Sequence, residues 1–108
     1  MKLASLAILL TLTMAPGLAN AADAAAGKEV FRSKCQSCHG EEGQGKAALE
    51  KMLKVKMDPL GSADVQSQTD EELAKIITTG RGKMPPVRNL SKTEVDNVIA
   101  FVRTLGKK

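Results

Sequence analysis

Residues 35–39 read Cys35-Gln36-Ser37-Cys38-His39 and contain both cysteines and the single histidine of the 108-residue chain. This C-x-x-C-H spacing is the attachment sequence of c-type haem. Cysteines three residues apart lie on one face of a helix, so both sulfurs can add to the two vinyl groups of one porphyrin. His39 follows directly and can ligate the iron from the same side. The pattern therefore predicts one covalently attached haem c.

Three other uses of the two cysteines fit the sequence less well. A thioredoxin-like dithiol requires a C-x-x-C beside a βαβ pattern, and no strand-like alternation occurs here. A zinc site requires four ligands, whereas Cys35, Cys38 and His39 are the only cysteines and histidine. A disulfide between the two cysteines would close a very short loop and would stabilise the fold little. Covalent haem attachment is the interpretation that the spacing favours.

The N-terminal residues have the pattern of a secretory signal peptide. A short basic start precedes an apolar stretch, and no charged residue occurs between Lys2 and Asp23. Ala19-Asn20-Ala21 then supplies the small residues of an A-x-A cleavage site. We therefore expect residues 1–21 to be removed on export to the periplasm, and residues 22–108 to form one small domain. A retained membrane anchor is the alternative.

Composition narrows the class of partner. The chain has 16 Lys and Arg against 12 Asp and Glu, a net charge of +4, which falls to +3 without Lys2. The charges interleave along the sequence, and no basic stripe is rich in aromatic residues, so nucleic acid binding is not supported. A mildly basic face can steer an acidic protein partner. We expect a monomer that has no membrane span after cleavage.

Capping signals and periodic apolar residues predict an all-α domain. Residues 69–72 and 91–94 are capping boxes, and residues 81–86 contain Gly82 and two prolines, which predict a loop. The core is thin because Phe31 and Phe101 are its only aromatic side chains, so a large cofactor would help to complete it. The expected helices run from Asp23 to about Ser37, from about Ala47 to Lys54, from Thr69 to Gly80 and from Ser91 to Gly106.

The second axial ligand of the iron has to be methionine, lysine or none, because His39 is the only histidine. Met52, Met57 and Met84 remain after cleavage. Met52 is expected to fill the core, and the role of Met57 is ambiguous. Met84 lies in a loop that Pro85-Pro86 stiffens, and such a loop holds a thioether against the iron at low entropic cost. Met84 is therefore the predicted second ligand.

Four segments of the predicted mature chain match a known family. They are Gly27-Lys28-Glu29-Val30-Phe31, Cys35-x-x-Cys38-His39-Gly40, Gly82-Lys83-Met84-Pro85 and Val98-Ile99-Ala100-Phe101-Val102. With these segments the chain resembles the small monohaem class I c-type cytochromes of bacteria. The resemblance implies a compact fold in which the first and last helices cross around one haem, with Gly27 and Phe31 meeting Phe101. It also implies His39 and Met84 as the axial ligands.

The chain departs from this family in two respects. Family members often use Trp or Tyr to hydrogen-bond a haem propionate, and this chain has neither. Arg81, Lys83 or backbone amides would have to replace that contact. The family also often orients the proximal histidine through a proline carbonyl, for which Pro59 is the only candidate before the methionine loop.

The resemblance implies a single-electron carrier rather than an enzyme, because two protein ligands leave no open position on the iron. The expected partners are a redox protein that donates the electron and another that accepts it. Both would dock electrostatically at the haem edge, beside Lys34, Arg81 and Lys83. Two alternatives remain open: a haem c subunit permanently bound to a larger oxidoreductase or oxidase complex, and a gas-binding or peroxide-reactive haem protein with a displaceable Met84.

Overall fold

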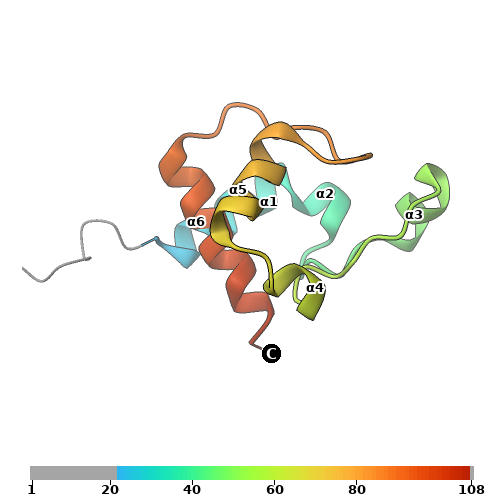
Figure 1. Ribbon diagram of the computed structural model, residues 1–108, viewed down its shortest axis with the longest axis horizontal. Coiled ribbons are helices and arrows are strands. Elements are labelled where there is room, and N and C mark those ends of the chain that lie inside the picture. The colour runs from blue at the N-terminus through green and yellow to red at the C-terminus, as the bar shows by residue number, and fades with distance from the viewer. Residues whose placement is uncertain (1–21, 108) are drawn as a thin grey trace, which may run out of the picture.

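The computed structural model describes residues 22–107, and Figure 1 shows how its helices are arranged. Among these residues the only β pairing is an isolated bridge between Arg81 and Met84, which agrees with the predicted all-α class. The predicted signal peptide, residues 1–21, lies outside the described residues. None of the described helices is long and apolar enough to span a bilayer. The helices are α1 (Ala24–Lys34), α2 (Gln36–His39), α3 (Ala47–Leu53), α4 (Ala63–Gln66), α5 (Asp70–Thr79) and α6 (Lys92–Leu105).

The predicted capping residues begin three of these helices. The Asp23 carboxylate accepts hydrogen bonds from the first backbone amides of α1, at 2.9 and 3.1 Å. Ser91 and Glu94 form a complete capping box at α6, with reciprocal bonds of 3.1 and 3.0 Å. At α5 the Thr69 hydroxyl accepts from the Glu72 amide at 3.1 Å. Local capping chemistry therefore explains where the main helices start.

The structure differs from the expected helices at two places. The first helix was expected to reach Ser37, but α1 ends at Lys34 because the backbone of Cys35 leaves the helical region before α2 begins. The single turn α4 was not expected, since its N-cap Ser62 makes no side-chain capping bond and four residues show no helical period. Both differences concern one turn of helix, where local signals are weakest.

The core forms where α1 and α6 cross (Figure 1). The rings of Phe31 and Phe101 lie with centroids 5.1 Å apart and planes tilted by 49°, which confirms this expected contact. Leu60 and Ile77 pack against both groups of buried side chains and so join them. One group contains Phe31, Cys35, Val98, Phe101 and Leu105, and the other contains Val65, Leu73, Val95, Ile99 and Val102.

Gly27 lets α1 and α6 approach each other closely. A Cβ atom on Gly27 would overlap the carbonyl group of Asn97 and lie 2.9 Å from the amide nitrogen of Val98. The closest neighbours of this position are therefore on the backbone of α6, one turn before Phe101. Asn97 also accepts a hydrogen bond from the Asp23 amide at 2.9 Å. The absence of a side chain at residue 27 thus sets the spacing of the helices.

Arg103 ties α6 to the segment between α4 and α5. Its guanidinium donates to the carbonyl oxygens of Gln66 and Gln68, at 2.9 and 2.6 Å. It also donates two bonds to one carboxylate oxygen of Asp70, at 3.2 and 2.8 Å. The Asp70 side chain is 68% exposed, so this ion pair is largely in solvent and stabilises the fold little. The bonds to the two carbonyl oxygens are the larger contribution.

Replacing Arg103 with lysine should lower the free energy of unfolding by about 1–3 kcal/mol, because an ammonium group cannot reach both carbonyls and the carboxylate together. Asp70→Asn is the matched control and should cost less than about 1 kcal/mol. Guanidinium unfolding of the haem-loaded protein would measure both. Equal losses in the two variants would mean that the ion pair, and not the carbonyl contacts, stabilises this junction.

Candidate haem site

The two thiols lie at the start of α2, with Cys35 between α1 and α2 and Cys38 within α2. The Cys38 and His39 amides donate to the Cys35 carbonyl at 3.2 and 3.0 Å, which places all three residues on one helical turn. Both cysteines are free thiols, with Cys35 buried and Cys38 exposed. Burial, and to a lesser degree the nearby Cys38, raise the pKa of Cys35 to about 11. The turn therefore presents two unpaired sulfurs, one toward the core and one toward solvent.

His39 is half-buried at the end of α2. Burial lowers the pKa of its imidazole, which favours the neutral ring that ligates metals. Its Nδ1 atom is buried and has no hydrogen-bond partner among the described residues. The carbonyl of Pro59, expected to orient this ring, accepts the Ser62 amide at 2.9 Å instead. The imidazole thus follows two thiols on one helical turn and has a buried nitrogen that makes no hydrogen bond within residues 22–107. These groups fit the thioether and axial-ligand positions of an attached haem.

The glycines after His39 reverse the direction of the chain, so that Gly45 returns to the backbone of His39. Gly40 has φ +86°, a conformation that L side chains rarely adopt, and it ends α2. The Gly45 amide donates to the His39 carbonyl at 2.6 Å, and the Leu60 amide donates to the Gly43 carbonyl at 2.8 Å. These bonds connect the histidine turn to the segment that precedes α4.

The loop that carries Met84 is tied down at three points. Arg81 and Met84 exchange two backbone hydrogen bonds, each of 2.9 Å. Gly80 has φ +79°, and a Cβ atom there would lie 2.7 Å from the Met84 carbonyl oxygen. Beyond the prolines, the Val87 amide donates to the Ile77 carbonyl at 2.8 Å, which anchors the loop to α5. The Met84 side chain is half-buried and held in a short constrained turn, as a ligand thioether requires.

The other two methionines among the described residues lie in and beside α3. Met52 is 71% exposed, so the expectation that it fills the core is wrong. The helical spacing is present, but α3 stands apart from α1, α5 and α6 at one end of the molecule (Figure 1), and Met52 reaches no core. Met57 is half-buried, and its amide donates to a carboxylate oxygen of Glu50 at 3.0 Å.

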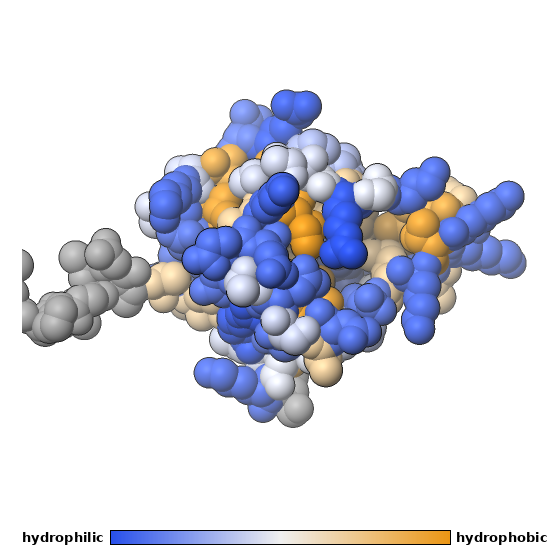
Figure 2. Space-filling view, viewed as in Figure 1, coloured by the Kyte–Doolittle hydropathy of each residue, from blue (hydrophilic) through white to orange (hydrophobic). Residues whose placement is uncertain are grey.

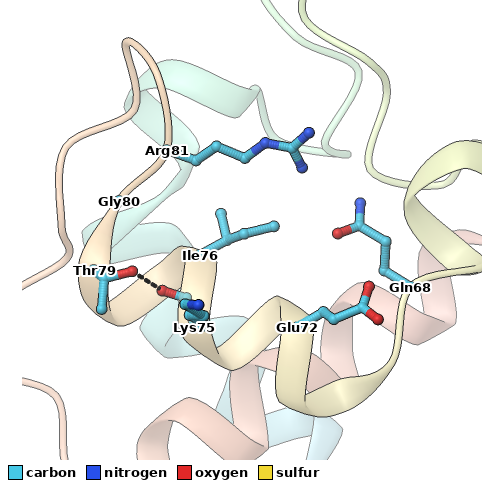
Figure 3. A pocket seen from close by; sticks show the side chains of 7 residues that line it. All are labelled: Gln68, Glu72, Lys75, Ile76, Thr79, Gly80 and Arg81. Atoms are coloured by element: carbon cyan, nitrogen blue, oxygen red, sulfur yellow. Dashed lines mark hydrogen bonds between the residues drawn. The ribbon is translucent and has the colours of Figure 1, made fainter.

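A shallow hollow of about 300 Å³ lies on α5 beside the methionine loop (Figure 3). The Arg81 side chain extends across it above Ile76, toward the amide of Gln68 (Figure 3). The hollow is lined by Gln68, Glu72, Lys75, Ile76, Thr79, Gly80 and Arg81. It holds no thiol, imidazole or thioether, so it is separate from the donor set. Within residues 22–107 no three His, Cys, Asp or Glu side chains gather as a metal site.

Comparison with known proteins identifies the family. Residues 22–102 match the family described as cytochrome c oxidase, cbb3-type, subunit III. The chain is 35% identical over 88 residues to cytochrome c6 of Picosynechococcus sp., a match that covers 76% of this chain and 73% of that protein. The chain belongs to the c-type cytochromes. It is also 30% identical over 92 residues to cytochrome c-554(547) of Halothiobacillus neapolitanus, covering 79% of this cytochrome and 99% of that one.

Two further similarities concern a larger protein and a solved structure. The cytochrome is 31% identical over 85 residues to the cytochrome bc1 complex cytochrome c subunit of Corynebacterium diphtheriae, but spans only 27% of that protein. The solved structure of KustC0563 c-type cytochrome superposes with a TM-score of 0.61 at 24% identity, covering 73% of this chain and 95% of that one, and it supports the fold. As a c-type cytochrome, this protein carries covalently bound haem c and transfers electrons rather than catalysing a reaction.

Proposed function

We propose that this cytochrome is a periplasmic single-electron carrier whose one haem c is bonded to Cys35 and Cys38 and ligated by His39 and Met84. Its domain would then be residues 22–108, after removal of a signal peptide of residues 1–21. The observation that carries the proposal is the set of donors: two free thiols on one turn with a half-buried imidazole, and a thioether in a loop held by backbone hydrogen bonds.

Each donor has one task. The Cys35 and Cys38 sulfurs would fasten the group to α2, and the adjacent His39 ring would supply one axial nitrogen. Met84 would supply a soft sulfur ligand, which favours the reduced metal and raises the potential. When bound, the haem supplies an iron that cycles between Fe(II) and Fe(III). With both axial positions taken, this chain exchanges electrons and leaves no position for a substrate.

The mass of the denatured protein should exceed that of the polypeptide by one haem, because two thioether bonds survive unfolding. Cys35→Ser and Cys38→Ser should each keep one bond and lose the other, whereas Ser37→Ala should retain both. Intact-protein mass spectrometry, with extraction by acidified acetone, measures the attachment. The same spectrum shows whether the chain begins at residue 22. A wild-type mass equal to the bare chain would falsify the assignment of both cysteines.

A permanently bound haem subunit is the second candidate. It is favoured by the oxidase-subunit family that matches residues 22–102 and by the bc1 complex relative. Size measurement of the native protein, released from its source at physiological salt, separates the candidates. A particle of the size of this chain alone supports the free carrier, and co-elution with a membrane complex supports the subunit.

A further inference from the structure

One short segment of this cytochrome is rich in exposed lysines. Residues 46–56, termed here the lysine loop, contain four lysines and one glutamate. Residues 73–93 form a second basic segment, with five basic side chains and no acidic one, and the other residues of 22–108 are acidic as a whole. The four lysines are all exposed and take part in none of the ion pairs found among the described residues: they are Lys46, Lys51, Lys54 and Lys56.

Met52 gives the lysine loop an apolar centre. At 71% exposure it is the one large hydrophobic side chain that stands in solvent among the described residues. Figure 2 shows an apolar patch framed by hydrophilic side chains at the end of the molecule where α3 lies. A flexible thioether within a cationic rim resembles the centre and rim of a protein interface, in which the apolar part desolvates and the charges select the partner.

Lys54 adds a second indication of function. It ends α3 with φ +55°, a left-handed conformation in which glycine or asparagine is favoured. A lysine there costs about 1 kcal/mol relative to glycine, and its charge near the helix C-terminus recovers only part of that cost. The exposed end of α3 therefore carries a lysine although its backbone conformation favours glycine.

The base of the lysine loop rests against the histidine turn. Gly45 and Met57 flank the loop, and a Cβ atom on Gly45 would lie 3.3 Å from the Met57 Cβ, so the two ends of the loop meet. The Gly45 amide also donates to the His39 carbonyl at 2.6 Å. A partner seated on the loop would therefore sit beside the segment that carries the candidate axial histidine.

We propose that the lysine loop is the docking surface for an acidic redox protein, with Met52 as its apolar contact. This inference rests on the proposed electron-carrier function and specifies the chemistry of the partner. The surface expected from the sequence, beside Lys34, Arg81 and Lys83, also carries basic side chains but includes no large hydrophobic side chain that stands in solvent among the described residues. Glu94 lies close enough to Lys34 that this lysine contributes, after hydrogen bonds from Ser91, to lowering the pKa of the glutamate. The Arg81 side chain extends over α5 (Figure 3).

The test uses the reduced, haem-loaded protein and two synthetic peptides, one of Glu-Glu-Leu repeats and one of Glu-Glu-Ser repeats. Amide chemical shifts locate the bound peptide. We expect shifts across residues 46–56, and affinity roughly tenfold weaker in Lys51→Glu/Lys54→Glu. Lys34→Glu/Lys83→Glu is the matched control, since it changes the net charge equally and should weaken binding only about twofold. Met52→Gln should remove the preference for the leucine peptide.

Lys54→Gly separates docking from folding. It removes a charge and relieves the backbone, so the midpoint of thermal unfolding should stay or rise while peptide affinity falls about twofold to threefold. Shifts centred on Lys34 and Lys83, or equal losses in the two double variants, would overturn the proposal. Binding to phosphatidylglycerol vesicles without binding to either peptide would overturn it in favour of a lipid surface. The proposed electron-carrier function is tested separately, by the mass of the wild-type protein with its haem and by its optical spectrum.

Discussion

Gly27→Ala should lower the midpoint of thermal unfolding of the haem-loaded protein by roughly 10–25 °C. Two effects oppose each other in this variant. Alanine is the better helix former by about 1 kcal/mol, which would stabilise α1. The added methyl group, however, would overlap the Asn97 carbonyl and lie 2.9 Å from the Val98 nitrogen, and backbone atoms cannot rotate away. The helices must separate, which weakens the Phe31–Phe101 contact, so we expect a net loss of about 2–4 kcal/mol.

Ala25→Gly is the matched control in the same helix. Residue 25 is exposed, so the change tests helix propensity without a packing partner and should cost only about 1 kcal/mol. Gly27→Val should be more damaging than Gly27→Ala, because the added volume is larger. A thermal midpoint that rises in Gly27→Ala would show that the propensity term prevails and that α1 and α6 do not approach closely at this residue.

Met84→Ala should convert the proposed carrier into a haem protein with an open axial position. The ferric protein should lose the weak near-infrared band of a sulfur-to-iron bond. Affinity for cyanide or carbon monoxide should rise at least roughly 100-fold, because no protein ligand has to be displaced. The midpoint potential should fall by on the order of 100 mV, since a thioether favours reduced iron. Optical spectra, ligand titration and potentiometry measure the three effects.

Met57→Ala and Met52→Ala are the controls for this assignment. Met57 is the other half-buried methionine among the described residues, and Met52 is exposed, so neither variant should change the band or the potential. If Met57→Ala abolishes the band and Met84→Ala leaves it, the ligand is Met57. Strong carbon monoxide binding by the wild-type protein would support the gas-binding alternative instead of the carrier.

The elements that could be predicted from sequence are those with local causes. The capping bonds of Asp23 and Ser91 involve residues within three positions, and the apolar period of α6 spans several turns. The pairing of Phe31 with Phe101 was predicted from the family resemblance, because it joins residues distant in sequence. The prediction of covalent haem depends only on the spacing of residues 35–39, so it could be made without knowing the fold.

The features that escaped prediction depend on where elements lie in space. Leu49 and Met52 have helical spacing, but that spacing does not reveal that α3 lies away from the core. Arg103 joins α6 to the carbonyls of Gln66 and Gln68. The sequence does not predict these bonds, because every arginine has the same five donors. The basic side chains gather in two segments, the lysine loop and residues 73–93, and counting charge in short windows of the sequence would have found both.

The crossing of α1 and α6 has a consequence for the order of biosynthesis. The hydrogen bond between Asp23 and Asn97 joins residues that lie 74 positions apart in the sequence. All four candidate haem residues lie between these two positions. The last helix leaves the ribosome last, and until then α1 has no partner to cover it. Cys35 is 9% exposed in the folded chain and packs with Phe101 and Leu105. A thioether at Cys35 is therefore made most readily on a chain that has not yet folded, and attachment competes in time with helix pairing.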